Sequence, residues 1–376
     1  MDTNAFTFSS QQRQAIDAVQ KWLASGVTRK PCFRLFGYAG TGKTMLARHL
    51  AAEIDGEVVY AAFTGKAALM MQKSGCQGAS TIHKLIYRVE QLPDGGSRFV
   101  LNRKSAAATA SLIVIDECSM VDIRMAEHLM CFGVPILVLG DPAQVPPMTG
   151  PGYFVDGEAD VLLTEIHRQA RDSGIIELSM AIREAKSFSH KTYDDVRLIS
   201  SDLELEKAML AADQVLAGRN KTVTALNKEI RVMKGFTGSI PNVGERLISY
   251  QNDSDNELLN GEQVEVVSVG ETNDDATICT LTVRSLDVIE REAFEVEVLI
   301  SGLEDGPDKA GLRWCRENSI AALRFAYAIT VHKAQGSQWP NVLVFNESHW
   351  FRDRQSEWLY TAVTRASERV TIFPHL

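Results

Sequence analysis

The chain has 376 residues, of which 45% are hydrophobic and 23% are charged, so it is long enough for two or three globular domains with cores of their own. Its six cysteines form no CxxC pair and have no histidines at ligand spacing, which argues against a zinc site and a disulfide framework. The formal net charge of -9 argues only weakly against nucleic acid, since a local basic groove can bind phosphates on an acidic protein.

A helix followed by alternating strands and helices is the first pattern along the chain. Residues 9–24 place Ile16, Val19 and Leu23 at helical spacing. Apolar runs that predict buried strands follow at 32–36, 57–63, 112–116, 135–141 and 161–165, and again at 213–218, 324–330, 341–345 and 369–373. The segments between them suit helices. The pattern predicts an α/β fold with two lobes, each a parallel sheet flanked by helices.

Two β-patterned stretches interrupt this alternation. Residues 86–105 alternate apolar and polar side chains around "PDGG", which predicts an exposed β-hairpin in the first lobe. Four further stretches within 244–300 have the same character and predict a small barrel inserted in the second lobe. The longest apolar runs, 111–115 and 134–140, are too short to span a bilayer, and the first ten residues do not resemble a signal peptide, so we expect a cytoplasmic protein.

The stretch "GYAGTGKT" directly follows the first predicted strand. It satisfies the pattern GxxxxGK[ST] through Gly37, Gly42, Lys43 and Thr44, in which backbone N–H groups surround a phosphate at a helix start. Glycine is needed because a side chain would block the approach of the backbone. A plain glycine turn before a helix is the alternative. The loop alone does not separate a kinase from a motor.

Acidic and amide side chains follow the next strands. Asp116 can hold Mg²⁺ beside Thr44, while the adjacent Glu117 polarises an attacking water molecule. The neighbouring strand ends before Gln144, which can reach the terminal phosphate. The alternative for Asp116 and Glu117 is that they are two solvated acids in a turn. The alternative for Gln144 is that it is an ordinary glutamine in a polar turn.

Arginines that stabilise transferred phosphate commonly come from another domain. The stretch "IHRQ" offers Arg168, and "YTAVTRAS" offers Arg365. Either can instead be one of the many surface arginines.

Eight stretches in a fixed order carry a family resemblance that covers nearly the whole chain. They are "GYAGTGKT", "AFTGKAA", "STIHKL", "VIDECSM", "LGDPAQVPPM", "HRQ", "AITVHKAQGSQW" and "YTAVTRA". Together with "FSSQQRQAI" near the start, this set resembles the superfamily 1B DNA helicases of the RecD and phage Dda type. Such a set in order is far more specific than any one motif.

The resemblance implies ATP and Mg²⁺ as cofactors and assigns a nucleotide site. Gln12 would read adenine, Glu117 would activate water, Gln144 would sense the γ-phosphate, and Arg168 and Arg365 would be arginine fingers. The phosphate-binding residues would be Gly37, Gly40, Thr41, Gly42, Lys43 and Thr44, and the metal ligands Thr44 and Asp116.

The same resemblance assigns residues that contact the DNA strand. On the first lobe these are Phe63, Thr64, Lys66, His83 and Pro147; on the second they are Asn220, Thr330, His332 and Lys333. Phe99 is added as the candidate wedge, because it is the aromatic residue near the tip of the predicted hairpin. Neutral donors with a few cations suit sequence-tolerant binding of a single strand. Taken singly, Thr64, His83 and His332 each have an ordinary structural role as the alternative, and Phe99 can pack onto the lobe as core.

The implied architecture is two RecA-like P-loop NTPase lobes. The first would span 1–170, with the hairpin at about 86–105 as a strand-separating pin; the second would span 171–240 and 321–376, with an SH3-like β-barrel at 241–320. We expect three departures from the family: no large N-terminal extension, a short segment between the barrel and "RFAYAIT", and a less basic stretch, "ASER", after Arg365.

The resemblance implies an ATP-dependent helicase that moves 5'-to-3' on single-stranded DNA and unwinds forked duplex DNA in replication, repair or recombination. Pro146 and Pro147 support this polarity, because the opposite branch carries stacking aromatics there. We expect a monomer in a bacterial cell or phage-infected host, with a single-strand-binding protein or replication and recombination proteins as candidate partners and no membrane. The alternatives are a translocase that displaces proteins without unwinding, a P-loop kinase, and a DNA-binding module without catalysis.

Overall fold

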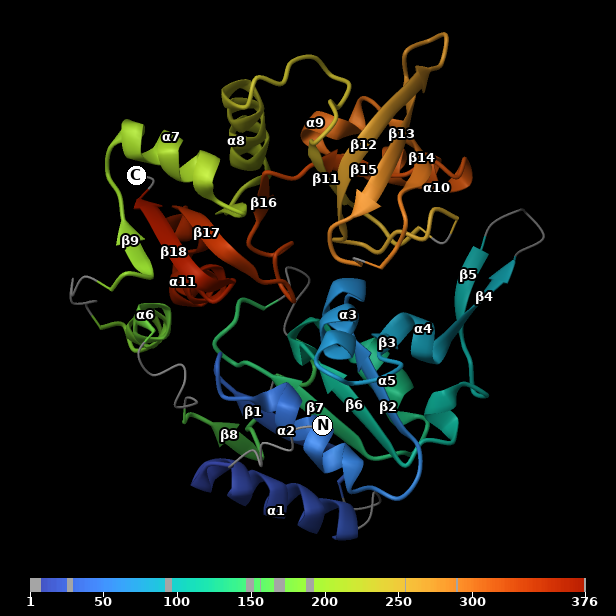
Figure 1. The fold of residues 1–376 in the computed structure, drawn as a ribbon. Coiled ribbons are helices and arrows are strands. Elements are labelled where there is room, and N and C mark those ends of the chain that lie inside the picture. The colour runs from blue at the N-terminus through green and yellow to red at the C-terminus, as the bar shows by residue number, and fades with distance from the viewer. Residues whose placement is uncertain are drawn as a thin grey trace. The chain divides into compact units, whose positions relative to one another are not determined.

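The computed structural model describes residues 8–25, 30–91, 97–146, 152–155, 157–165, 173–186, 193–253, 255–288 and 290–374. The chain divides into two compact units, Met1–Asp172 and Ser173–Leu376, whose elements are labelled in Figure 1. Among the described residues, none of the helices has the length and apolar character that a bilayer crossing requires.

The first unit is built on a six-stranded sheet in which every pairing is parallel, in the order β3-β2-β6-β7-β1-β8. Its strands are β1 (Cys32–Gly37), β2 (Val58–Ala62), β3 (Ser80–Thr81), β6 (Leu112–Asp116), β7 (Ile136–Gly140) and β8 (Val161–Leu163). All five residues of β7 are buried, as expected for a parallel strand covered on both faces.

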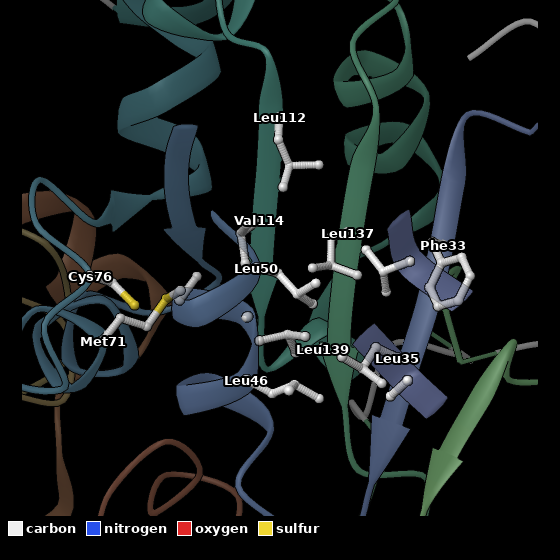
Figure 2. Packing of buried hydrophobic residues seen from close by; sticks show 14 of the residues in the cluster. Phe33, Leu35, Leu46, Leu50, Met71, Cys76, Leu112, Val114, Leu137 and Leu139 are labelled. Carbon is white, nitrogen blue, oxygen red and sulfur yellow. The ribbon is translucent and has the colours of Figure 1, made fainter. Parts of the chain in front are cut away.

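Helices and two apolar clusters cover this sheet. The helices are α1 (Ser10–Ser25), α2 (Lys43–Ala52), α3 (Gly65–Lys73), α4 (Ile82–Ile86) and α5 (Ile123–Met130), with short 3-10 turns η1 (Ala106–Ala108) and η2 (Cys118–Met120). Figure 2 shows Leu46 and Leu50 of α2 directed at Val114, Leu137 and Leu139 of the central strands. This packing fixes α2, and with it the phosphate loop, at the carboxyl edge of the sheet.

A two-stranded antiparallel sheet forms where the sequence predicts a hairpin. Strand β4 (Tyr87–Gln91) pairs with β5 (Ser97–Leu101), and Arg88 lies opposite Val100. The turn between them, 92–96, lies outside the described residues.

The second unit contains a five-stranded parallel sheet in the order β16-β10-β17-β18-β9. Its strands are β9 (Val196–Leu198), β10 (Gln214–Ala217), β16 (Ala328–Thr330), β17 (Trp339–Asn346) and β18 (Ala366–Pro374). Its helices are α6 (Gly174–Arg183), α7 (Asp202–Ala211), α8 (Asn220–Met233) and α11 (Gln355–Val363), and the 3-10 segment is η4 (Ser348–Arg354). The predicted α/β fold, with parallel sheets flanked by helices, is confirmed.

An antiparallel sheet is inserted in this unit, in the order β14-β13-β12-β11-β15. It comprises β11 (Arg246–Ser249), β12 (Gln263–Thr272), β13 (Ile278–Ser285), β14 (Phe294–Leu299) and β15 (Leu323–Phe325), with helices α9 (Gly302–Asp305) and α10 (Lys309–Glu317).

The prediction of one strand over 324–330 was wrong. Residues 323–325 pair with β11 of the inserted sheet, whereas 328–330 pair with β10 of the parallel sheet. The chain crosses between the sheets at Ala326 and Tyr327, both buried. A continuous apolar run does not reveal such a crossing, because both sheets bury it. The inserted sheet therefore extends beyond residue 320.

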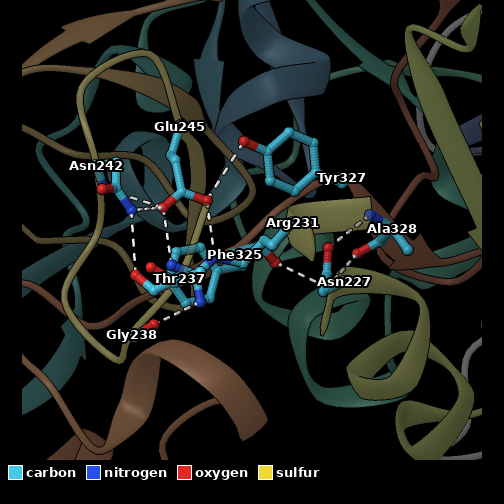
Figure 3. Close-up of polar contacts among 9 residues, drawn as sticks. All are labelled: Asn227, Arg231, Thr237, Gly238, Asn242, Glu245, Phe325, Tyr327 and Ala328. Atoms are coloured by element: carbon cyan, nitrogen blue, oxygen red, sulfur yellow. Dashed lines mark hydrogen bonds and ion pairs between the residues drawn. The ribbon is translucent and has the colours of Figure 1, made fainter. Parts of the chain in front are cut away.

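A buried ion pair joins the inserted sheet to α8 (Figure 3). The Arg231 guanidinium donates to both carboxylate oxygens of Glu245, at 2.7 and 2.9 Å, and Glu245 has no exposed surface. Tyr327 donates a longer bond of 3.4 Å to the same carboxylate, and the Arg231 guanidinium lies 3.8 Å from the ring centroid of Phe325. Helix and sheet are thus held by a pair that is almost entirely buried.

Replacing Glu245 by Ala should destabilise the second unit strongly, because Arg231 would stay buried without its partner. We expect the free energy of unfolding to fall by about 3–5 kcal/mol, measured by urea denaturation. Glu245→Gln, which retains an acceptor, should cost less, and Glu295→Ala on the exposed face of β14 should cost little. A Glu245→Ala protein as stable as the parent would show that the pair does not hold the helix to the sheet.

Candidate functional site

The phosphate loop runs from the end of β1 to the start of α2. Gly40 and Gly42 have φ of 76° and 80°, a left-handed conformation that glycine adopts without strain. Gly42 is the N-cap of α2 and supplies no side-chain acceptor. The first N–H groups of the helix therefore point into the loop and favour an anion there.

The Lys43 side chain folds over this loop. Its ammonium donates to the carbonyls of Gly37 and Tyr38, at 2.6 and 3.1 Å. The Thr41 hydroxyl donates to the same Tyr38 carbonyl at 2.8 Å. A positive charge and the start of a helix dipole are therefore both present in the loop, which suits a phosphate chain.

Gln12 connects α1 to the phosphate loop. Its amide nitrogen donates to the Thr41 carbonyl at 3.1 Å, its amide oxygen accepts from the Ser9 backbone at 3.0 Å, and the residue is 3% exposed. The structure thus gives Gln12 a contact with the loop. Its reading of adenine stays a prediction.

Asp116, at the end of β6, lies beside the helix start. One carboxylate oxygen accepts from the Thr44 hydroxyl at 2.8 Å, and the other accepts from the Glu117 backbone N–H, also at 2.8 Å. Glu117 has φ 51° and ψ 47°, an uncommon conformation for a residue with a side chain and one found at functional sites. Thr44, Asp116 and Glu117, which the sequence predicts to bind Mg²⁺ and to activate water, therefore lie together.

Gln144 follows β7, which pairs with β6 in parallel as the sequence predicts. Its side-chain oxygen is buried and accepts no hydrogen bond from the described part of the chain. A buried acceptor of this kind needs a donor. A water molecule would satisfy it.

Thr44 and Asp116 fit a magnesium ion. Mg²⁺ takes oxygen ligands, and in nucleotide sites it is held by one or two protein groups together with phosphates and water. No group of three His, Cys, Asp or Glu residues suited to a metal occurs among the described residues. An ion here would therefore depend on nucleotide phosphates for its other ligands.

Several predicted strand-binding residues of the first unit gather after β2 and β3. The Thr64 hydroxyl caps α3 by accepting from the Ala67 N–H at 3.1 Å, and Lys66 in the first turn is buried. The Phe63 ring lies 6.2 Å from the His83 ring. Burial lowers the pKa of His83, against the opposing charge of Asp122, so this imidazole is neutral near pH 7.

Phe99 of β5 belongs to the same aromatic group. Its ring centroid lies 5.8 Å from that of His83 and 6.1 Å from that of Tyr87, and the residue is 62% exposed. Phe99 is therefore not a core residue. It rests on two rings and keeps a large open surface.

The predicted strand-binding residues of the second unit lie after the carboxyl ends of β10 and β16. Asn220 is exposed at the start of α8, and Thr330 ends β16, where its hydroxyl accepts from the Lys333 N–H at 3.2 Å. Burial lowers the pKa of His332, whose ring centroid lies 5.7 Å from that of Phe351. His332, like His83, is thus expected to act as a neutral group.

Lys333 is held by residues of the inserted subdomain. Its ammonium donates to the Asn260 side chain at 2.6 Å and lies 4.3 Å from the centroid of the Tyr250 ring. Burial, with a smaller contribution from the charge of Arg324, lowers its pKa to about 8. Arg324 in turn donates to the Tyr250 hydroxyl at 2.8 Å and to the Asn220 carbonyl at 3.4 Å.

Arg365 is buried next to α11. Its guanidinium donates to the carbonyls of Thr361 and Ser337, at 3.1 and 3.3 Å, and to the Thr364 hydroxyl at 3.2 Å. All three acceptors are neutral. The predicted residues Arg168 and Pro147 lie outside the described residues.

Three residues that the structure places at this edge of the second unit were not predicted from the sequence: Tyr250, Asn260 and Glu347. Tyr250 and Asn260 come from the inserted subdomain, and no local pattern connects them to Lys333. Glu347 had a usable signal, since it directly follows an apolar strand of a parallel sheet, where functional side chains concentrate.

A family model described as an AAA domain matches residues 7–201, more than half of the chain. The chain belongs to this AAA domain family. A second model, the UvrD-like helicase C-terminal domain, matches residues 325–373.

Two curated relatives are RecD proteins. The chain is 26% identical over 372 residues to the ATP-dependent RecD2 DNA helicase of Deinococcus radiodurans, covering 89% of this chain and 46% of that protein. It is 28% identical over 437 residues to the RecBCD enzyme subunit RecD of Mycobacterium tuberculosis, covering 96% and 68%. The chain thus spans about half the length of the RecD2 relative.

Solved Pif1 helicases share the fold. Bacteroides Pif1 bound to ssDNA has a TM-score of 0.58 at 19% identity, over 98% of this chain and 92% of that one. Pif1 from Candida albicans has a TM-score of 0.55 at 17% identity, over 99% and 95%. The resemblance to RecD-type helicases found in the sequence is confirmed.

Proposed function

We propose that this AAA domain protein is an ATP-dependent DNA helicase that moves 5'-to-3' along single-stranded DNA. One observation carries the proposal: in the first unit, the phosphate loop, Asp116 and the Phe63–His83 group all follow strands of one parallel sheet at their carboxyl ends. A nucleotide and a strand bound along one edge can influence each other through the same loops.

The residues of the first unit have separate roles in this proposal. The N-terminus of α2 and Lys43 bind the phosphates, Glu117 takes a proton from the attacking water, and Gln144, whose side-chain oxygen accepts no hydrogen bond within the described part of the chain, senses the γ-phosphate. Bound Mg²⁺ would be held by Thr44 and Asp116 and would neutralise phosphate charge. Arg365 and Arg168 are proposed as arginine fingers; the three acceptors that the Arg365 guanidinium contacts in the described part of the chain are neutral, so its charge remains available for an anion.

Single-stranded and forked duplex DNA are the proposed substrates. The solved Pif1 structures include one bound to ssDNA and one of two Pif1 helicases at forked dsDNA. In this chain the neutral His83 and His332, with Thr64 and Asn220, suit contacts that do not depend on sequence.

The β4–β5 hairpin and the inserted sheet receive roles by the same reasoning. We assign the hairpin as the strand-separating pin because Phe99 exposes a large aromatic surface on it. We assign the inserted antiparallel sheet as the SH3-like barrel. The division into RecA-like lobes, monomeric state and cytoplasmic location remain predictions.

Three other functions remain distinguishable by experiment. A protein-displacing translocase would hydrolyse ATP on DNA without unwinding. A P-loop kinase would show no stimulation by DNA. A DNA-binding module without catalysis would tolerate the loss of Glu117.

The proposal predicts DNA-dependent ATP hydrolysis and directional unwinding. The rate of ATP hydrolysis should rise severalfold or more when an oligodeoxynucleotide is added. A forked duplex with a 5' single-stranded tail should be separated faster than one with only a 3' tail. The two rates are measured by phosphate release and by strand displacement. An ATPase indifferent to DNA would contradict the proposal, and faster unwinding from the 3' tail would contradict the polarity.

Glu117→Gln should separate chemistry from binding. Loss of a positioned general base lowers kcat by about 10²-fold or more, while nucleotide affinity should change little because Glu117 does not hold the phosphates. The measurements are steady-state hydrolysis and equilibrium binding of ATP with Mg²⁺. The exposed Glu127→Gln on α5 is the matched control. Near-parental turnover would remove Glu117 from the mechanism.

Lys333 should give DNA binding a pH dependence. Phosphate binds the charged ammonium, and the pKa of Lys333 is lowered to about 8, so the charged fraction is high below this pH and falls above it. Affinity for an oligonucleotide should therefore decrease between pH 8 and 9.5, by at most about tenfold per pH unit for one proton. Lys333→Arg stays charged and should remove the decrease. An unchanged pH profile in that variant would exclude Lys333 as the source.

A further inference from the structure

An exposed tryptophan lies at the same sheet edge as the predicted strand-binding residues of the second unit. Strands β16, β10 and β17 are adjacent and parallel, so their carboxyl ends meet at one edge. The segments after these ends carry His332, Asn220 and Trp350 respectively. Trp350 is 55% exposed in η4, and no role in the nucleotide chemistry accounts for it.

The Trp350 ring is supported on Arg219. The guanidinium carbon lies 4.3 Å from the ring centroid. Arg219 itself is fixed, because its Nε and Nη2 atoms lie 2.8 and 2.7 Å from a Glu347 carboxylate oxygen. The ring is therefore held in place before any ligand arrives.

Buried Glu347 fixes the position of Arg219 under the Trp350 ring. It has no exposed surface, and it accepts hydrogen bonds from the backbone N–H groups of Gly218 and Arg219, at 2.8 and 3.0 Å, and from the Thr222 hydroxyl at 2.7 Å. Burial opposes its ionisation, but these bonds and that of the Arg219 side chain outweigh burial and lower its pKa. The carboxylate also neutralises Arg219, which is consequently a poor phosphate ligand.

The backbone next to Trp350 is strained. Arg352 has φ 48° and ψ -114°, which interrupts the helical turn. The preceding Phe351 turns inward, with its ring stacked on buried Trp358 at 5.4 Å. Adjacent aromatic residues thus serve opposite purposes: Phe351 packs against the core and Trp350 remains open.

We propose that Trp350, supported by Arg219, is a stacking platform for a base of the single strand bound at this edge. The inference rests on the proposed function and adds a base contact to it. A rigid aromatic ring with one guanidinium neighbour and open surface binds any base through its π-face. Stacking on a preformed ring also avoids the entropy cost of ordering a side chain.

Trp350→Ala should weaken binding of a thymidine oligonucleotide by about 5- to 100-fold, the range typical of one lost stacking contact. The dependence of affinity on salt should keep the parental slope, because no phosphate contact is removed, whereas Lys333→Ala should lower the slope. Trp350→Phe keeps a ring and should recover most of the affinity. Trp314→Ala is the matched control, since Trp314 is 40% exposed on α10 of the inserted subdomain.

A second oligonucleotide, equal in length but with abasic sugars throughout, distinguishes lost base stacking from a general structural effect of the substitution, because it keeps the phosphates and has no bases. The parent should bind it more weakly than the thymidine strand, and Trp350→Ala should reduce that preference. Thermal unfolding midpoints verify that the variants are folded. The stacking platform would be overturned if Trp350→Ala bound the thymidine strand with parental affinity, or if it lost the same affinity for the thymidine and abasic strands. DNA-stimulated ATP hydrolysis by the parent protein would still support the helicase in that case. No binding of any oligonucleotide by the parent would overturn both.

Discussion

Parallel pairing of β1, β2, β6 and β7 is the constraint on which the first unit depends. Parallel strands all end at the same edge, so the loops that follow them are brought together whatever their separation in sequence. This places the Lys43 loop, Asp116 and Gln144 on one edge. The buried leucines of α2 then hold the phosphate loop against the sheet, and the bond between Thr44 and Asp116 joins the segment after β1 to the end of β6.

The features that could be predicted from the sequence are those with a local signal. Apolar runs such as 112–115 and 136–140, the glycine pattern of the phosphate loop and the alternation around "PDGG" each reflect a physical requirement within a few residues. The strand at 324–330 failed because its division between two sheets depends on partners distant in sequence. The support of Lys333 by Tyr250 and Asn260 could not be predicted for the same reason.

In both units, burial determines the charge state of the candidate strand-binding residues more than the net charge of the chain does. A chain with a net charge of -9 does not attract DNA as a whole. Burial keeps His83 and His332 neutral and weakens the basicity of Lys333. For the proposed helicase, this arrangement favours moderate binding of the strand through hydrogen bonds, helix termini and aromatic surface, as repeated release of the strand would require.

In the second unit, one buried arginine contacts the surroundings of two candidate strand-binding residues, Asn220 and Lys333. Arg324 donates to the Asn220 carbonyl at the start of α8 and to the hydroxyl of Tyr250, whose ring lies against Lys333. Arg324 comes from β15, the strand that joins the inserted sheet just before the chain returns to the parallel sheet at β16. A displacement of the inserted sheet would therefore disturb the start of α8 and the Lys333 side chain together. Because the buried Arg231–Glu245 pair holds the same sheet to α8, such a displacement is costly, and the sheet serves as a rigid support for the proposed strand-binding edge.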